Sequence, residues 1–279
     1  MKKLFALVNH VLHSYVRRVF RTGFPLTKPD KLGTLLPVSK LTISLIIPAH
    51  NEENYIAHCL DSCTRHYPET FQEIIVIDNA STDRTAEIAS AYPGVRVVRE
   101  DRKGLLFARQ RGFKEAKGDL LAYVDADSQI PPHWTQMLLR EFSADPDLIC
   151  LSGPYAYRRE EMTRVQHALT RFFWYGVAPV TASIVGFAVT GGNFVARREA
   201  LQAIGGFDTS IAFYGEDTNL ARRLHTVGKV KFSRSFHVFS SARRMRSDGF
   251  AKMGAIYALN YFSEAIFHRP MTKTYRDVR

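Results

Sequence analysis

Cysteine is scarce in this chain, and its scarcity excludes a fold held together by disulfides. Only Cys59, Cys63 and Cys150 occur among 279 residues, and their spacing matches no metal-ligand pattern. Cys59 and Cys63 lie one helical turn apart, so we expect them to be small residues of a hydrophobic core. Nothing in the cysteine usage opposes a reducing compartment.

Two phosphate-binding motifs are absent as well. No G-x-G-x-x-G follows the first predicted strand, and no G-x-x-x-x-G-K-[ST] occurs anywhere in the sequence. The first absence argues against a dinucleotide-dependent oxidoreductase, and the second argues against a P-loop enzyme.

An uninterrupted apolar run long enough to span a membrane is also missing. Residues 172–190 contain no charged side chain, and a bilayer span needs about 20 apolar residues. However, Gly176, Pro179 and Gly186 interrupt this stretch, and polar Thr181 lies within it. We therefore expect the segment to be buried or inserted shallowly in a membrane surface.

Acidic residues are scarce at both ends of the chain. The whole chain has 38 Lys and Arg against 27 Asp and Glu, a formal net charge of +11. Residues 1–40 have 8 basic residues against 1 acidic, and residues 240–279 have 8 against 3, which leaves 22 against 23 for residues 41–239. Cationic ends on a neutral body favour an anionic membrane surface over nucleic acid as a partner. We therefore predict a peripheral protein on the cytoplasmic, inner face of the cell membrane that binds no nucleic acid.

Both cationic ends are predicted to be helical extensions. Apolar residues recur at helical spacing from Leu4 to Val19 and alternate with basic residues, which indicates an amphipathic helix within residues 1–40. This helix either lies in a membrane interface or packs on the protein itself. Residues 241–279 are expected to form a second basic extension, with an aromatic amphipathic helix from Phe250 to Phe267.

Between these ends, short apolar runs alternate with amphipathic segments, which is the pattern of parallel strands covered by helices on both faces. The sequence therefore predicts an α/β fold with a doubly wound, Rossmann-like and mostly parallel sheet. Strands are expected at residues 43–47, 73–77, 95–98, 120–124 and 229–232, and helices at 53–66, 82–89, 104–116, 198–204 and 216–224.

Polar residues follow three of the predicted strands, where ligands of such sheets bind. They are residues 48–52, residues 78–83 and the tripeptide Asp125-Ala126-Asp127. Alternate side chains of an extended chain share a face, so Asp125 and Asp127 converge and need a cation. Carboxylates together with substrate phosphates suit Mg²⁺ or Mn²⁺. The alternative is an Asx turn that only closes the strand.

These pieces resemble the family 2 glycosyltransferases of the GT-A fold. The resemblance covers about residues 41–240, with 41–128 as a nucleotide-sugar half and 129–240 as an acceptor half. It rests on the order of its motifs along the chain. These are residues 46–52, residues 76–83, Ala108-Arg109-Gln110-Arg111-Gly112, Ala116-Lys117-Gly118-Asp119, Asp125-Ala126-Asp127, Gly191-Gly192-Asn193, Gly205-Gly206-Phe207-Asp208 and Glu216-Asp217.

The resemblance implies a metal-dependent, inverting glycosyltransferase. It would move a sugar from a nucleotide-diphosphate sugar donor to a hydroxyl of a membrane-associated lipid or glycan acceptor, with Mn²⁺ or Mg²⁺ as cofactor. The implied metal ligands are Asp127, Asp125 and the later His237. The implied donor-binding residues are Pro48, Ala49, Asn51, Glu52, Asp78, Asn79, Lys103, Arg109, Asp125, Gly191, Gly192 and Glu216.

Three further positions bear on the donor. Many relatives carry an acid at the position of Asn79, but an amide both donates and accepts, so it is still able to pair with uracil. Arg243 and Arg244 follow His237 closely, and clustered arginines suit phosphate oxygens. We expect them either to close over the diphosphate or to form a solvated or lipid-facing basic run.

Asp217 is predicted to be the catalytic base. The resemblance implies that one carboxylate takes the proton of the acceptor hydroxyl while it attacks the anomeric carbon from the face opposite the leaving group. The alternative is that Asp217 or Glu216 only stabilises a helix N-terminus.

Three other functions fit parts of the same pattern. A polyprenyl phosphate acceptor is already ionised and needs little base. A nucleotidyltransferase also holds Mg²⁺ with carboxylates at strand ends. A membrane-associated binding protein would need no chemistry, but the intact Asp125, Asp127 and Asp217 argue against it.

Overall fold

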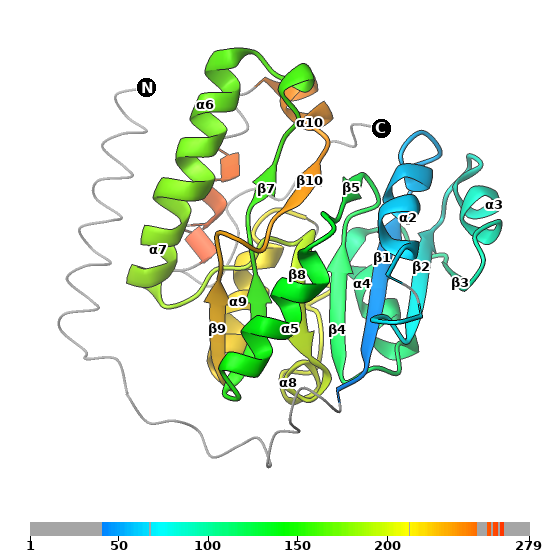
Figure 1. Ribbon diagram of the computed structural model, residues 1–279, viewed down its shortest axis with the longest axis horizontal. Helices are drawn as coiled ribbons and strands as arrows, with labels where there is room; N and C mark the ends of the chain where they lie inside the picture. Colours follow the sequence, from blue (N-terminus) through cyan, green and yellow to red (C-terminus); the bar gives the residue numbers. More distant parts are fainter. Residues whose placement is uncertain are drawn as a thin grey trace.

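Two β-sheets organise the described part of the chain (Figure 1). The computed structural model describes residues 41–66, 68–211, 213–249, 256–257, 259–261 and 263–264. The predicted N-terminal extension, residues 1–40, lies outside these residues, as does most of the predicted helix from Phe250 to Phe267. The larger sheet has the strand order β3-β2-β1-β4-β8-β6-β9, and the smaller one has the order β5-β10-β7.

The first half of the larger sheet consists of parallel strands and the helices that connect them, as the sequence predicts. Its elements are β1 (Ile43–Ala49), α2 (Ile56–Thr64), β2 (Glu73–Asn79), α3 (Thr85–Ser90), β3 (Val95–Glu100), α4 (Leu105–Glu115) and β4 (Leu120–Val124). β1 pairs in parallel with β2 on one side and with β4 on the other. The carboxyl ends of these strands therefore meet at one edge of the sheet.

The second half completes the sheet with one antiparallel strand. β8 (Asn193–Arg197) lies between β4 and β6 (Leu148–Ser152) and runs antiparallel to both, while β9 (Lys229–Phe232) pairs in parallel with β6. The sheet is therefore mostly parallel, as predicted. The helices of this half include α5 (Trp134–Ala144), α8 (Arg198–Ala203) and α9 (Glu216–His225). Of these elements, α5, β6 and β8 are absent from the sequence-based prediction.

Helices cover both faces of the larger sheet, so its strands bury both sets of alternating side chains. On β1, Leu45 faces a cluster that includes side chains of α2 and α5, whereas its neighbour Ile46 faces a cluster that includes side chains of α4 and α9. Cys59 and Cys63 are fully buried in the first cluster, as predicted.

The smaller sheet brings three distant segments to the edge where β4 ends. Its first strand, β5 (Ser128–Gln129), directly follows the Asp125-Ala126-Asp127 turn. β10 (Val238–Ser240) pairs antiparallel to β5 and parallel to β7 (Tyr155–Ala156). The helix after β10, α10 (Arg243–Asp248), consequently begins beside the Asp pair.

A helical rod stands upright at the left of Figure 1, beside the two sheets. After the 3₁₀ turn η2 (Arg159–Glu161), it consists of α6 (Arg164–Phe172), the π-helix η3 (Phe173–Val177) and α7 (Ala178–Val185). Thr163 begins the rod with a capping box, in which its hydroxyl and the Gln166 side chain bond each other's backbone N–H. Within the described part of the chain, no helix is long and apolar enough to cross a membrane.

Residues of the predicted C-terminal extension pack against α9. The carboxylate of Glu264 is fully buried and accepts a hydrogen bond from Asn219 Nδ2 at 3.0 Å. Arg222 pairs with the same carboxylate at 3.2 Å. These two contacts fix the described residues of 256–264 on the acceptor half.

Asn193, the first residue of β8, connects α5 with the segment that precedes β10. Its Oδ1 accepts a hydrogen bond from Trp134 Nε1 at 3.1 Å, and its Nδ2 donates to the carbonyl oxygen of Phe236 at 2.7 Å. Asn193 is fully buried, so water cannot take its place as the hydrogen-bond partner of Trp134 or of the Phe236 carbonyl.

Replacing Asn193 with Ala is expected to lower the free energy of unfolding by about 2–4 kcal/mol, because an indole N–H and a carbonyl group then stay buried without partners. Urea denaturation followed by fluorescence measures this change. Gln202→Ala, at an exposed position of α8, is the control and should stay within about 0.5 kcal/mol of the parent. Equal unfolding midpoints for the two variants would contradict the buried connection.

Candidate functional site

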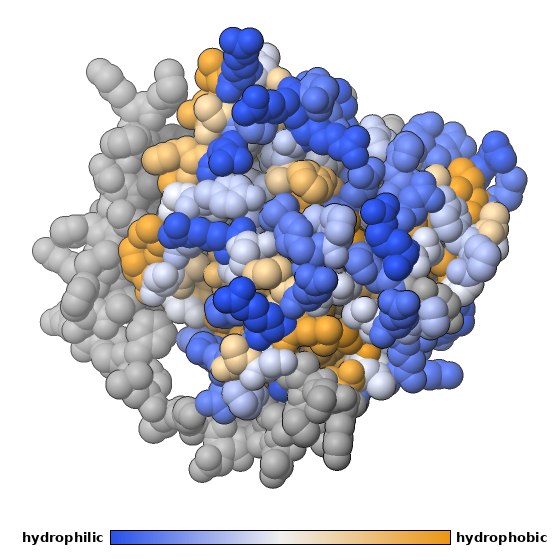
Figure 2. Space-filling view, in the orientation of Figure 1, coloured by the Kyte–Doolittle hydropathy of each residue, from blue (hydrophilic) through white to orange (hydrophobic). Residues whose placement is uncertain are grey.

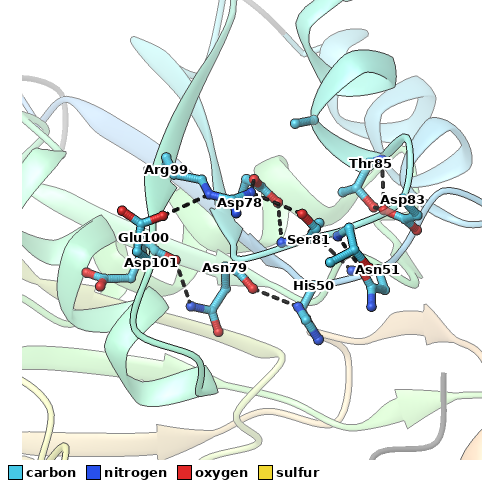
Figure 3. Close-up of polar contacts among 12 residues, drawn as sticks. His50, Asn51, Asp78, Asn79, Ser81, Asp83, Thr85, Arg99, Glu100 and Asp101 are labelled. Carbon is cyan, nitrogen blue, oxygen red and sulfur yellow. Dashed lines mark hydrogen bonds and ion pairs between the residues drawn. The ribbon is translucent and has the colours of Figure 1, made fainter.

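The loops after β1 and β2 are tied together at the carboxyl edge of the sheet (Figure 3). The His50 ring meets the carbonyl oxygen of Asn79 through Nδ1 at 2.7 Å. Asn51 has a left-handed backbone (φ 52°), and its Oδ1 accepts a hydrogen bond from the backbone of the loop after β2 at 2.8 Å. Asp78 is buried and pairs with Arg99. Asn51 and Asp78 are predicted to bind the donor. Their side chains bond other parts of the protein, namely the loop after β2 and Arg99 of β3.

Asn79 has a structural partner for each end of its amide. Nδ2 donates to the carbonyl oxygens of Glu100 and Arg102 at 3.2 and 2.7 Å, and Oδ1 accepts from the Gly104 N–H at 2.8 Å. Both N–H groups of the amide are thus used within the protein, and one lone pair of Oδ1 is left for the predicted pairing with a nucleobase. Asn79 thereby fixes the loop that connects β3 to α4.

A cavity of about 430 Å³ opens beside these loops. Four predicted donor residues line it, namely Pro48, Ala49, Asn79 and Lys103, together with the first turn of α4. That turn contains no acidic residue, and the N-terminus of a helix attracts negative charge. The volume suits a small-molecule ligand of about the size of a nucleoside.

Asp125 lies at the centre of a second cluster. The Tyr155 hydroxyl donates to Asp125 Oδ2 at 2.9 Å and accepts from the Gly192 N–H at 2.9 Å. Arg109 Nη2 lies 3.8 Å from Asp125 Oδ1, and Nη1 donates to Glu216 Oε2 at 2.6 Å. Because only 1% of the Arg109 side chain is exposed, this residue is a buried counter-charge to two carboxylates. Arg109, predicted to bind the donor, is instead held inside the protein by these two carboxylates.

Gly191 and Gly192 are needed because this cluster is crowded. A Cβ atom on Gly192 would lie 1.8 Å from Asp125 Oδ2, and one on Gly191 would lie 2.7 Å from Arg109 Nη2. Both distances are well inside van der Waals contact. These two glycines, predicted to bind the donor, are therefore approached closely by side chains of the protein itself.

Asp127 lies in a third cluster with Arg243, the first residue of α10. Arg243 Nη1 donates to Glu52 Oε2 at 2.8 Å, and Nη2 lies 3.1 Å from Asp127 Oδ2. The guanidinium also lies over the ring of Tyr55, 4.7 Å from its centroid. Burial raises the pKa of Asp127 to about 7, although the charge of Arg243 opposes this rise. The ionised form of Asp127 therefore depends on a nearby cation.

The Asp pair fits a metal ion that shares its ligands with a substrate. Carboxylate oxygens suit Mg²⁺ and Mn²⁺. In the described ranges, no group of three or more His, Cys, Asp or Glu side chains is arranged to hold an ion. Oxygen atoms of a bound phosphate compound would have to complete the shell.

The structure separates His237 from the Asp pair, contrary to the prediction that it is a metal ligand. β10 pairs with β5 so that Ser240 lies opposite Ser128, and His237 precedes Ser240 by three residues, about 10 Å along an extended chain. Its ring packs at 5.5 Å from the rings of both His133 and Phe239. His237 therefore packs with aromatic rings just before β10.

Glu216 and Asp217 begin α9 next to the Asp125 cluster. Burial raises the pKa of Glu216 to about 7, while its partner Arg109 counteracts the rise. Burial also raises the pKa of Asp217, whose Oδ1 accepts from the Thr218 N–H at 2.8 Å. A role limited to stabilising the helix N-terminus would favour the ionised form and lower the pKa. Desolvation is the larger effect, and it makes Asp217 a stronger base.

Three residues at this edge have roles that the sequence does not reveal or reveals only in part. Tyr155 positions Asp125, and its only sequence signal is the Tyr-x-Tyr pattern at 155–157. Glu161 accepts a hydrogen bond at 2.7 Å from the Ala242 N–H, just before α10. Arg244 lies over the ring of Phe213, 4.6 Å from its centroid, and Phe213 lines the 430 Å³ cavity.

Known proteins share the motifs and the fold. Residues 44–205 match the family model described as glycosyl transferase family 2. The chain is 36% identical over 100 residues to glycosyltransferase AglE of Haloferax volcanii and 36% identical over 113 residues to dolichol-phosphate mannosyltransferase of Pyrococcus furiosus. These matches cover 34% and 39% of this chain but only 33% and 32% of the two relatives, about a third of the length of each.

Solved structures extend the similarity over nearly the whole chain. Mannosyltransferase PcManGT from Pyrobaculum calidifontis, in complex with GDP-Man and Mn²⁺, superposes with a TM-score of 0.61 at 21% identity. The superposition covers 95% of this chain and 73% of the other. At this level of identity, the similarity concerns the fold.

Replacing Gly192 with Ala is expected to displace Asp125 and Tyr155 and to lower the turnover of a nucleotide-sugar donor at least about tenfold, because small displacements at a reacting centre are costly. Steady-state kinetics with Mn²⁺ measures this effect. Gly176→Ala is the control, because a Cβ atom there would lie 3.6 Å from its nearest neighbour, and it should retain the turnover of the parent. Unchanged turnover in Gly192→Ala would contradict the crowding around Asp125.

Proposed function

The chain belongs to glycosyl transferase family 2 and has the GT-A fold, and we propose that it is a metal-dependent, inverting transferase. It moves a sugar from a nucleotide-diphosphate sugar to a hydroxyl group of a membrane-associated lipid or glycan. The observation that carries this proposal is the ion-paired series Asp125–Arg109–Glu216, which ends beside Asp217. The series connects the carboxylates proposed to serve the leaving group with the carboxylate proposed to serve the acceptor.

The 430 Å³ cavity is the proposed site of the donor's nucleoside. Pro48 and Ala49 from the end of β1 supply an apolar wall, and Lys103 with the N-terminus of α4 offers positive charge at the same cavity. The solved relative PcManGT holds GDP-Man and Mn²⁺, which supports a nucleotide sugar as the donor of this chain.

Asp125 and Asp127 are the proposed ligands of Mn²⁺ or Mg²⁺. When bound, such an ion supplies a Lewis acid that stabilises the departing nucleoside diphosphate. Tyr155 holds Asp125 in place through its hydroxyl. Arg243 pairs with Asp127 and Glu52, and its release from Asp127 would make the guanidinium available to diphosphate oxygens.

Asp217 is the proposed base for the acceptor hydroxyl. It accepts the proton as the hydroxyl oxygen forms its bond to the anomeric carbon and the bond to the diphosphate breaks on the opposite face. Burial favours this role because it raises the pKa of Asp217. Arg109 fixes the neighbouring Glu216 and thereby the first turn of α9.

A second candidate function is transfer to a polyprenyl phosphate. The 36% identity to dolichol-phosphate mannosyltransferase of Pyrococcus furiosus favours it. A phosphate acceptor is already ionised at neutral pH, so it needs no proton acceptor. The contribution of Asp217 to the rate therefore separates the two candidates.

Replacing Asp217 with Asn is expected to lower kcat for a hydroxyl acceptor by about 10²–10⁴-fold, because proton transfer to a positioned base contributes on that order. Release of nucleoside diphosphate from a panel of nucleotide sugars, with Mn²⁺ and acceptor, measures kcat. In the parent, kcat/KM should fall as the pH falls through a pKa above about 4, the ordinary carboxyl value, since protonation removes the base. The part of this limb that belongs to Asp217 should disappear in Asp217→Asn, whereas the titration of Asp127 and Glu216, whose pKa values are about 7, remains.

Glu87→Gln is the matched control, because Glu87 is an exposed acid in the first turn of another helix, α3. It should leave the rate unchanged. A loss of less than about threefold in Asp217→Asn would reject the hydroxyl acceptor in favour of the phosphate. Release of pyrophosphate from a nucleoside triphosphate, with no reaction of any nucleotide sugar, would identify a nucleotidyltransferase instead.

A further inference from the structure

The helical rod of α6, η3 and α7 exposes a row of large apolar side chains. Six of the nine large hydrophobic residues that are exposed in the described part of the chain belong to it. Figure 2 shows hydrophobic residues along the left side of the molecule, over the positions of α6 and α7 in Figure 1. We name this row the apolar face, and its members are Val165, Leu169, Phe172, Phe173, Val180 and Ile184.

The members of the apolar face share one side of the rod. Their spacing follows the helical repeat from α6 to α7, while Thr170, Ala178 and Val185 are buried on the side towards the protein. Phe172 and Val165 are each 68% exposed. Contiguous exposed apolar surface of this kind indicates a site where a partner or a membrane binds.

The π-helix connects the apolar face to the catalytic edge. Phe173 is exposed at 46%, and its ring lies 5.1 Å from that of the next residue, Trp174. Trp174 in turn contacts the ring of Tyr155 at 5.6 Å, and the Tyr155 hydroxyl bonds Asp125. One indole ring therefore separates the exposed surface from Tyr155, which holds Asp125, and π-helical turns often occur at functional sites.

We propose that the apolar face lies on an anionic bilayer surface and that the acceptor is lipid-linked, reaching the Asp125 cluster past Trp174. The statement about the acceptor rests on the proposed transferase function, whereas the statement about the surface does not. The rod is about 30 Å long, calculated from 1.5 Å per residue, and it lies flat in the headgroup layer of the inner leaflet.

Charge identifies the bilayer as the partner. Arg164 and Arg171 are exposed on α6 beside the apolar face, and no charged residue occurs between Arg171 and Arg197. Apolar side chains flanked by basic ones are typical of helices that lie in a membrane interface. The excess of Lys and Arg at both chain ends adds attraction for anionic lipids.

The first experiment is flotation of the full chain with vesicles of phosphatidylglycerol and phosphatidylcholine. The double variant Phe172→Ser, Phe173→Ser should bind at least about tenfold more weakly than the parent, because two aromatic rings leave the interface. Leu139→Ser is the matched control, since Leu139 is exposed at 37% on α5, and it should bind as the parent does. Vesicles of phosphatidylcholine alone should bind all three proteins weakly.

The second experiment needs no variant of the apolar face. The chain has two tryptophans, and Trp134 is 1% exposed in the core. Anionic vesicles with brominated acyl chains should therefore quench the fluorescence of Trp174 in the parent. Trp174→Phe should abolish the quenching while the Trp134 emission remains.

Other occupants of the apolar face give different results, and each would overturn the proposal. If a second copy covers it, the double variant changes from dimer to monomer in size-exclusion chromatography and vesicles leave Trp174 unquenched. If residues 1–40 cover it, the double variant binds vesicles as the parent does and unfolds at lower urea. Donor turnover with a short, water-soluble acceptor should be the same in parent and double variant, so loss of vesicle binding alone leaves the proposed chemistry intact.

Discussion

Clustered negative charge is the constraint on which the rest of the site depends. Among the described residues, Arg109 and Arg243 form ion pairs with four of five carboxylates at the carboxyl edge of the larger sheet, and Arg244 adds positive charge near Asp127. Burial nevertheless raises the pKa of both Asp127 and Glu216 to about 7, so the arginines offset the desolvation only in part. A divalent cation bound with a diphosphate would add the missing positive charge at the Asp pair. The carboxylates are those of Glu52, Asp125, Asp127, Glu216 and Asp217.

The two arginines differ in how firmly they are held. Arg109 comes from α4, is 1% exposed and lies between Asp125 and Glu216, so it is a fixed part of the core. Arg243 comes from α10, is 18% exposed and reaches Asp127 from the rim. The smaller sheet positions residues of both clusters. β5 follows Asp127 and β10 leads to Arg243, while β7 contains Tyr155. The same sheet joins the site to the helical rod through the contact of Tyr155 with Trp174.

Much of the fold is predictable from the sequence, for a physical reason. Strands that are buried on both faces are continuous apolar runs. The alternation of strands and helices over residues 43–124 is therefore predictable from the pattern of apolar residues along the sequence. β8 is not readable in this way, because Gly191-Gly192 just before it indicates a loop, and its antiparallel place between β4 and β6 depends on partners far away in sequence. Asp125 and Asp127 stand out in the sequence because two acids follow a buried strand, but the structure places them in a turn, where the Ser128 N–H donates to the carbonyl oxygen of Asp125 and the two side chains join different clusters. The roles of Asn79, Arg109 and His237 are not predictable, since each is decided by which groups the folded chain brings to it: a loop backbone, two carboxylates and a second histidine ring.

The most direct test of the shared metal site is a titration of Mn²⁺, with the free ion followed by electron paramagnetic resonance, in the presence and absence of a nucleoside diphosphate. We expect the nucleoside diphosphate to tighten Mn²⁺ binding at least about tenfold, and Mn²⁺ to tighten nucleotide binding by the same factor. Asp127→Asn should abolish this coupling, whereas Asp101→Asn, at a side chain that is 87% exposed, should retain it. Mn²⁺ binding that is equally tight without the nucleotide, or coupling that persists in Asp127→Asn, would contradict a metal held jointly by the Asp pair and the donor.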